Sequence, residues 1–404
     1  MTTILHGMRV VEGSAFVAVP LAGMTLAQMG ADVIRFDRLQ GGLDARRWPE
    51  TADGHSLFWA GMNKGKRSLA VDLGRPEGQE IVTALITAPG PDAGMFLTNL
   101  PARGWMGYPA LAARRPDLIM VSLTGTRRGE PAVDYTVNPS LGFPMATGPE
   151  GSSDPVAHVL PAWDCITGQV VVSTLLAAER HRLRGGGGQL AELSLKDVAA
   201  AMVANLGILA EVTVNGVDRP RSGNSLYGAY GQDFVCACGS RVMVIGLTDR
   251  QWSGLVKVLE MGAQIAALSA ASGLDLGAEG NRWRARARIT ALFAPWFAAR
   301  TRDQIAAMFD KAGLTWAPFR SFAEAVRDDP DLSTDNPMMA QIDQPGVGPL
   351  TVPGHPVNYH ALPRQTPAPA PRLGQHTEAI LADILGLGPG QIGALMDAGV
   401  VAGP

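Results

Sequence analysis

The residue of this sequence best suited to chemistry is Asp164, the single carboxylate in the segment 161–169. The residues that follow, up to Arg182, carry apolar side chains at helical spacing and end in a basic cluster. That pattern predicts a helix with positive charge near the negative end of its dipole. Asp164 then occupies the position of an N-cap, and two interpretations are open. Its carboxylate either caps the amides of the first helical turn, or it is a nucleophile in an apolar recess whose pKa those amides lower.

The composition is that of a compact folded protein. The chain has 404 residues, 46% apolar and 18% charged, which suits two or three domains with sizeable cores and is too apolar for a disordered chain. A net charge of −3 gives no reason to expect nucleic acid or an anionic membrane as partner. Residues 1–8 lack the basic flank and apolar run of a signal peptide, and no stretch of membrane-spanning length is free of charge, glycine or proline. We therefore expect a cytoplasmic protein.

The cysteines indicate neither disulfides nor a metal site. Cys165, Cys236 and Cys238 are an odd and sparse set, unlike a disulfide framework. Cys236 and Cys238 are separated by one residue, too close for the usual zinc knuckle, and no further cysteine completes a set of ligands. We expect no bound metal.

The elements that must position Asp164 begin with an alternation of strands and helices. Apolar runs predict strands at 9–12, 32–36, 69–72, 95–98 and 118–123, with helices at 20–29 and 76–86. This alternation predicts an α/β fold with a parallel sheet covered by helices on both faces. Ligands of such sheets bind beyond the carboxyl ends of the strands. Four loops lie there: 16–19, 38–42, 99–103 and 125–129.

Two turns lack the features of nucleotide-binding motifs. The turn after the first strand, residues 12–20, lacks the three spaced glycines that let a pyrophosphate approach the backbone. The glycine run in 184–189 lacks the Lys-Ser or Lys-Thr of a phosphate loop, and it joins a helix to a strand rather than the reverse. We interpret the second segment as a turn.

A change in composition near residue 216 predicts a domain boundary. The segment 216–231 is rich in glycine, asparagine, arginine and tyrosine, and an apolar strand at 241–247 follows it. The alternating arginines of 282–288 are expected on a solvated helix face. Beyond residue 340 the chain becomes proline-rich, through 363–371, which predicts an extended tether before a last helix at 377–385. The expected organisation is 1–215 as a large domain, 216–230 as a linker or lid, 231–325 as a small domain, and 326–404 returning to the large domain.

Four segments together resemble the family III CoA-transferases (the CaiB/BaiF type), nearly from end to end. They are the second-strand segment 30–37, the Asn-Lys-containing segment 63–72, the Ala-Trp-Asp of 162–164, and the C-terminal segment 370–377. The resemblance implies a large Rossmann-like domain built from both chain ends, a smaller central α/β domain, and two subunits interlocked as a homodimer. Asp164 stands where the family carries its catalytic aspartate.

The resemblance also implies how the substrate, a small-molecule CoA thioester, is bound. Val17 and Ala18 are expected near the thioester, and Arg38, Asn99 and Arg103 near the nucleotide and pantetheine arm. Lys66 and Arg67 are looser candidates for phosphate contact, and an exposed solvated role is open for each basic residue. Tyr227, Gly228, Tyr230 and Gly231 are expected in a lid, with amides of 228–231 stabilising oxyanions. CoA is part of the substrate, and no permanently bound cofactor is implied.

Four further segments resemble a subgroup of the family in which CoA moves within one molecule: 10–16, 133–139, 160–164 and 400–404. For this subgroup the implied reaction shifts CoA from carbon 1 to carbon 4 of a branched unsaturated C4-type dicarboxylic acid monothioester, 2-methylfumaryl-CoA. Asp164 would form first a mixed anhydride and then an aspartyl-CoA thioester. Water must be excluded from the anhydride. The side chains expected to form the walls are Phe143, Pro144, Trp163, Tyr227 and Tyr230, each of which could equally be core packing.

Competing functions are open to different degrees. An intermolecular CoA-transferase, acting between an acyl-CoA and a free carboxylic acid, is the main alternative. An acyl-CoA racemase would need a histidine some tens of residues before the aspartate, and the chain has none between His55 and His158. A Cys165 thioesterase would need a base, for which His158 is the sole nearby candidate in sequence. A CoA-binding protein without activity is the non-enzymatic alternative.

Overall fold

The computed structural model describes residues 3–404, in two compact units that are treated separately. The first unit contains the chain up to Leu141, then Val159–Leu209 and Pro330–Pro404, so both chain ends belong to it. The second contains Gly142–His158 and Ala210–Asp329. It is larger than the expected segment 231–325. Residues after 210 join it because Arg221 donates to the Met145 carbonyl at 2.8 Å and the Gly223 amide donates to the Gly148 carbonyl at 3.0 Å.

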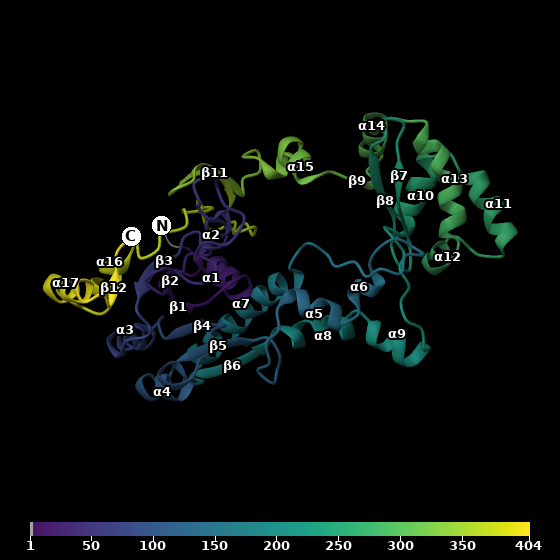
Figure 1. Ribbon diagram of the computed structural model, residues 1–404. Coiled ribbons are helices and arrows are strands. Elements are labelled where there is room, and N and C mark those ends of the chain that lie inside the picture. The colour runs from purple at the N-terminus through teal and green to yellow at the C-terminus, as the bar shows by residue number, and fades with distance from the viewer. Residues whose placement is uncertain (1–2) are drawn as a thin grey trace. The chain divides into compact units, whose positions relative to one another are not determined.

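A seven-stranded sheet organises the first unit (Figure 1). Its strands run in the order β12-β3-β2-β1-β4-β5-β6, all parallel except β12, which is antiparallel to β3. This is the order of a doubly wound sheet, with its topological switch point between β1 and β4. The strands are β1 (Arg9–Gly13), β2 (Asp32–Asp37), β3 (Arg67–Val71), β4 (Met95–Thr98), β5 (Ile119–Thr124), β6 (Gln189–Ser194) and β12 (Val401–Ala402). The expected parallel α/β fold is confirmed.

Helices cover the sheet because its central strands are apolar toward both faces. On one side, α3, α4, α16 and α17 enclose a core with β-strand residues such as Ile34, Phe36 and Phe96. On the other, α1 and α7 pack against each other. The helices of this unit are α1 (Ala18–Gln28), α2 (Leu57–Met62), α3 (Pro76–Thr87), α4 (Tyr108–Arg114), α5 (Asp134–Ser140), α7 (Ala162–Leu183), α8 (Leu195–Asn205), α16 (Thr377–Asp383) and α17 (Pro389–Asp397), with short 3₁₀ turns at Gly104–Met106 and Pro330–Leu332.

The C-terminal part of the first unit contains a hairpin that the sequence did not predict. Strands β10 (Met339–Gln344) and β11 (Gly348–Pro353) pair antiparallel. Between β11 and α16, residues 354–376 contain no regular element, as expected for a proline-rich tether. The helix expected at 377–385 is α16, which ends at Asp383, and it is not the last one, because α17 follows at Pro389–Asp397.

The second unit is built on a three-stranded antiparallel sheet of order β7-β8-β9. Its strands are β7 (Tyr230–Val235), β8 (Arg241–Gly246) and β9 (Thr315–Pro318), and its helices are α6 (Phe143–Ala146), α10 (Asp249–Val258), α11 (Gly262–Ser272), α12 (Glu279–Arg284), α13 (Arg286–Ala298), α14 (Arg302–Ala312) and α15 (Phe322–Asp328). Helix α9 (Ile208–Asn215) spans the boundary of the two units. An aromatic cluster containing Phe234, Phe293 and Phe297 forms the core.

The expectation that the arginines of 282–288 are all solvated is wrong for Arg282. Its side chain is fully buried and donates to the carbonyls of Leu247 at 2.8 Å and Gly277 at 2.6 Å. A guanidinium can be buried when carbonyl oxygens accept hydrogen bonds from its N–H groups. A charge pattern in the sequence does not reveal such acceptors.

No single helix within residues 3–404 is long and apolar enough to cross a membrane. Two bent helix pairs, α8 with α9 and α10 with α11, reach that length and composition only when each pair is taken together.

Candidate active site

The topology of the first unit brings the starts of α1 and α7 to one edge of the sheet. Helix α1 follows β1 directly, and α7 lies in the crossover from β5 to the parallel strand β6. A helix that follows a parallel strand starts at that strand's carboxyl end, which is where such sheets bind ligands. At the switch point Asn99, after β4, holds Ala15, after β1. Its side-chain nitrogen donates to the Ala15 carbonyl at 2.8 Å, and its side-chain oxygen accepts from the Ala15 amide at 2.9 Å.

Asp164 is not the N-cap of its helix. Helix α7 begins at Ala162, so Asp164 is the third residue of the first turn. The cap is Asp134, at the start of α5, whose Oδ2 accepts from the amides of Trp163 at 2.7 Å and Asp164 at 3.2 Å. The purely structural interpretation of Asp164 as a cap is therefore wrong, because a carboxylate 30 residues earlier satisfies those amides. No ion pair or hydrogen bond of the Asp164 carboxylate is found among residues 3–404.

The pKa of Asp164 is raised, to about 6. Burial is the largest cause, the Asp134 charge adds to it, and the Arg47 charge opposes it. The expected lowering by helix amides does not occur, since Asp134 both takes those amides and repels a second negative charge. At neutral pH Asp164 is still ionised, but its charge is poorly solvated, as suits a nucleophile.

The first turns of α7 and α1 lie close together. One turn after Asp164, Gly168 lies so close to α1 that a Cβ there would be 2.8 Å from the Ala18 carbonyl oxygen. Residues four apart share a helix face, so Asp164 is on the face of α7 that approaches α1. Val17 is half-buried at the first turn of α1 and Ala18 is buried. The structure thus brings Val17 and Ala18 to the same region as Asp164.

Arg47 is a residue of this region that sequence reasoning missed. It lies in the loop after β2, is exposed, and places its guanidinium 5.4 Å from the ring centre of Phe16 and 5.3 Å from that of Phe58. Phe16 has a φ of 68°, a left-handed conformation that is uncommon for a residue with a side chain. The sequence offers only an Arg-Arg pair in a loop, with no signal that the charge of its second member acts on Asp164.

The expected phosphate contacts differ in exposure. Arg38 and Arg103 are exposed, in the loops after β2 and β4. Lys66 is buried instead, and its Nζ donates to Glu12 Oε1 at 2.8 Å, to the Pro20 carbonyl at 2.8 Å and to Asn63 Oδ1 at 3.0 Å. All three protons of its ammonium group are used, so Lys66 is removed from the candidates for phosphate contact. Arg67 pairs with Asp32 at 2.6 Å.

The lid candidates belong to the second unit. Tyr230 is fully buried in the aromatic core, with ring centres 5.5 Å from Trp252 and 5.8 Å from Phe293, and therefore cannot swing as a lid residue. Gly231 is a buried strand residue whose Cβ would be 2.8 Å from Leu226. Tyr227 is exposed, with its hydroxyl on Glu211, and Gly228 has a positive φ with open space around it.

Two further side chains of the expected site have clear local roles. Trp163 is buried, and its indole nitrogen donates to Asn138 at 3.1 Å, so the aromatic wall beside Asp164 is held in place. Burial raises the pKa of the Cys165 thiol, and the charges of Asp164 and Asp134 raise it further. A thiol kept protonated is a poor nucleophile, which disfavours the thioesterase alternative.

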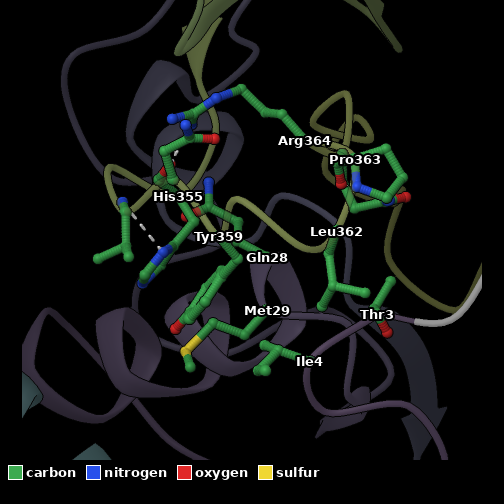
Figure 2. Close-up of a pocket in the computed structure, with 12 residues that line it drawn as sticks. Thr3, Ile4, Gln28, Met29, His355, Tyr359, Leu362, Pro363 and Arg364 are labelled. Atoms are coloured by element: carbon green, nitrogen blue, oxygen red, sulfur yellow. Dashed lines mark hydrogen bonds between the residues drawn. The ribbon is translucent and has the colours of Figure 1, made fainter.

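The hollow shown in Figure 2 is not large enough for a CoA thioester. It has a volume of about 40 Å³, and residues near both chain ends line it, including Thr3, Gln28, His355 and Arg364. Sites for ligands of drug size occupy several hundred Å³. No group of three or more His, Cys, Asp or Glu that could hold a metal occurs within residues 3–404.

Comparison with known proteins identifies the family. The model of CoA-transferase family III matches residues 5–377. The chain belongs to this family. It is 57% identical to the 2-methylfumaryl-CoA isomerase of Chloroflexus aurantiacus over 405 aligned positions, covering 100% of this chain and 99% of that protein. It is 29% identical to a succinate–glutarate CoA-transferase of Agrobacterium fabrum, covering 94% and 95%.

Solved structures of the family share the fold. A CaiB/BaiF family protein from Brucella suis superposes with a TM-score of 0.76 at 26% identity, covering 95% of this chain and 100% of that one. Within this family III CoA-transferase, Asp164 is a carboxylate at the carboxyl edge of the large unit that has no hydrogen-bond or ion-pair partner among residues 3–404.

Proposed function

We propose that this family III CoA-transferase isomerises 2-methylfumaryl-CoA by moving CoA from the carbon-1 to the carbon-4 carboxyl group. The reaction type is supported by Asp164, a carboxylate of raised pKa without a hydrogen-bond or ion-pair partner among residues 3–404, at the carboxyl edge of the sheet. The choice of substrate rests on one observation, the 57% identity over the whole chain with the Chloroflexus 2-methylfumaryl-CoA isomerase.

The proposed chemistry uses Asp164 as the carrier of CoA. An Asp164 oxygen attacks the thioester carbonyl and the carbon–sulfur bond breaks. CoA leaves as a thiolate, and the acyl group remains on Asp164 as a mixed anhydride. The thiolate then attacks the Asp164 carbonyl of that anhydride, which gives an aspartyl-CoA thioester and a free carboxylate. The second carboxylate of the same acid attacks this thioester, and the steps run in reverse. A serine or cysteine could not replace Asp164, because the carrier must itself be a carboxyl group.

The remaining site residues are proposed in supporting roles. Val17 and Ala18 lie beside the thioester, and Arg38 and Arg103 bind the CoA phosphates. Asn99 acts indirectly, since its side-chain amide already holds Ala15 in place. Tyr227 and Gly228 of the second unit remain candidates for covering the site. CoA enters only as part of the substrate.

The test is incubation of the protein with 2-methylfumaryl-carbon-1-CoA alone, followed by chromatography for the carbon-4 isomer. Isotopically labelled free mesaconate is added in a parallel reaction. Isomer without incorporated label supports the proposal, and Asp164→Asn should abolish turnover while CoA-ester binding is retained. Full activity of Asp164→Asn would remove the mechanism.

The same pair of reactions distinguishes the intermolecular alternative from the proposed isomerisation. The similarity to the Agrobacterium succinate–glutarate CoA-transferase favours it as the second candidate. It requires that turnover depend on an added free acid and that label from that acid enter the CoA ester pool.

Assembly and location are part of the proposal. We propose an interlocked homodimer, as the family resemblance implies, and a location in the cytoplasm. In support, α9 buries none of its residues in the single chain, and Val212 and Val214 are 43% and 81% exposed.

A further inference from the structure

Arg47 is the feature of the site that the proposed chemistry leaves without a role. Its guanidinium lies near the ring centres of both Phe16 and Phe58, at 5.4 and 5.3 Å. No carboxylate among residues 3–404 pairs with it. An exposed arginine against aromatic rings keeps its five N–H donors in one plane and available to a ligand.

The loop that carries Arg47 is fixed at both sides. Three residues before it, Asp44 is fully buried and accepts from the buried Arg35 at 2.8 Å. The Arg47 carbonyl accepts from the Ser56 hydroxyl at 2.5 Å. Phe16, on which the guanidinium rests, directly precedes the turn that leads into α1. The cation is therefore held in place before any substrate arrives.

The Arg47 charge also acts on the Asp164 carboxylate. There it opposes the effects of burial and of Asp134. Phe16 lies beside Val17 and Ala18, and Gly168 of α7 approaches the Ala18 carbonyl. Asp164, Phe16 and Arg47 thus meet at one edge of the sheet.

A dicarboxylate monothioester brings a third negative charge to this edge. Its free carboxylate is only a few atoms from the thioester carbonyl that Asp164 attacks, and Asp134 is already negative nearby. Like charges this close in a partly buried site repel strongly. A planar guanidinium binds a carboxylate through two parallel hydrogen bonds and offsets that repulsion.

We propose that Arg47, held against Phe16 and Phe58, binds the free carboxylate of the substrate and selects dicarboxylic acyl groups at the Asp164 site. This inference rests on the proposed function. The two ends of the acid exchange roles during transfer, so Arg47 binds the carbon-4 carboxylate while carbon 1 reacts and the carbon-1 carboxylate while carbon 4 reacts.

The test uses the full-length protein with Arg47→Gln and Arg47→Lys, and Arg46→Gln as the matched control, since Arg46 is the exposed neighbour in the same loop. Two quantities are measured: kcat/KM with 2-methylfumaryl-CoA, and the Kd of free CoA, which has no acyl carboxylate. Arg47→Gln is expected to lower kcat/KM roughly 10- to 100-fold, the range for a lost charged hydrogen-bond pair, with the Kd of CoA unchanged. Arg47→Lys should recover part of the loss, and Arg46→Gln should match the wild type.

The inference is overturned if Arg47→Gln weakens free CoA binding by the same factor, since the residue then only supports the fold of the site. Unchanged kcat/KM in Arg47→Gln also overturns it. Failure of the proposed function is seen separately, in the wild type. If the wild type transfers CoA only to an added acid, the same variants are assayed with free mesaconate as acceptor, and Arg47→Gln must raise KM for that acid. If the wild type places no CoA on Asp164 at all, both proposals fall.

Discussion

At the residue scale, Asp134 occupies the amides that begin α7 and leaves the Asp164 carboxylate without a hydrogen-bonded partner. The two carboxylates at the start of α7 have different environments, as paired carboxylates do in many acid–base sites. Asp134 is 1% exposed and accepts two amide protons, whereas Asp164 is half-buried and accepts none from the described chain. This asymmetry supports the proposal that Asp134 is structural and that Asp164 is the reactive carboxylate.

The raised pKa of Asp164 predicts an acid limb in the rate. Only the ionised carboxylate attacks a thioester, so kcat/KM should fall as pH drops through about 6. Asp134→Asn removes the charge that raises this pKa and should move the limb to lower pH, while Arg47→Gln should move it to higher pH. The pH profiles of the three proteins are the measurement. A limb that stays in place in both variants would show that another group controls it.

The same shift predicts a pH-dependent stability change. A carboxyl with a folded pKa of about 6 and a lower unfolded pKa binds more protons when folded, so its contribution to stability is lost as pH rises from about 4 to 6. Asp164→Asn should therefore stabilise the protein at pH 8, by about 2 kcal/mol, and change it little at pH 4.5. Denaturant unfolding at the two pH values checks this. An equal effect of Asp164→Asn on stability at the two pH values would contradict the raised pKa of Asp164 in the folded protein.

Lys66 and Arg38 give a contrasting pair for the basic residues. Lys66→Ala removes the nearer of the two cations that pair with the buried Glu12 and leaves only Arg35, at 3.7 Å, which should cost about 3 kcal/mol of folding free energy. Arg38→Ala removes an exposed charge and should leave Tm within about 2 °C while raising KM for the CoA ester. Thermal unfolding and steady-state kinetics separate the two. A stable Lys66→Ala protein with raised KM would restore Lys66 as a phosphate contact.

At the scale of elements, the close packing of α7 on α1 sets the position of Asp164. Gly168 permits this approach because any Cβ would meet the Ala18 carbonyl at 2.8 Å. Gly168→Ala should force the helices apart and cost about 1–3 kcal/mol of folding free energy. It should also lower kcat by more than the loss of folded protein explains. Gly61→Ala in α2 is the matched control, since nothing lies within 4 Å of its Cβ position. Equal kcat in the two variants would show that the α1–α7 spacing does not position the nucleophile.

The strands were predictable from sequence and the site contacts were not. Buried parallel strands are apolar runs, so the expected strands at 32–36 and 95–98 match β2 and β4 within one residue. Half-exposed strands such as β10 lack that pattern. Asp134 caps a helix 30 residues away, and Arg47 lies against Phe16, which belongs to a different loop. The sequence around each of these residues contains no pattern that predicts its contact. The aspartate itself was found because its neighbours resemble a family motif.

At the scale of the whole molecule, two distant motifs of the family form one structural joint in the first unit. The segment 63–72 contains β3, and the C-terminal segment 370–377 binds its backbone. The Ser68 amide donates to His376 Nδ1 at 3.1 Å, and the Gly374 amide donates to the Ser68 hydroxyl at 3.0 Å. Strand β12 then pairs with β3. The resemblance in these segments reflects how the two chain ends close one sheet, as Figure 1 shows for β3 and β12.

Thr377 lies at the centre of this joint and offers its test. Its buried hydroxyl accepts from the Ala70 amide at 3.2 Å and donates to the Ala402 carbonyl at 2.7 Å, joining β3, α16 and β12. Thr377→Val keeps the shape but leaves two buried backbone groups unpaired, at a cost of about 2–4 kcal/mol. The exposed Thr334→Val should change stability by less than about 0.5 kcal/mol. Denaturant unfolding of both variants measures the difference. The joint closes the sheet on which α7, the helix of Asp164, packs. Thr377→Val should therefore reduce activity at temperatures where the wild type is still fully folded. Equal stability of the two variants would show that the chain ends do not hold the unit together.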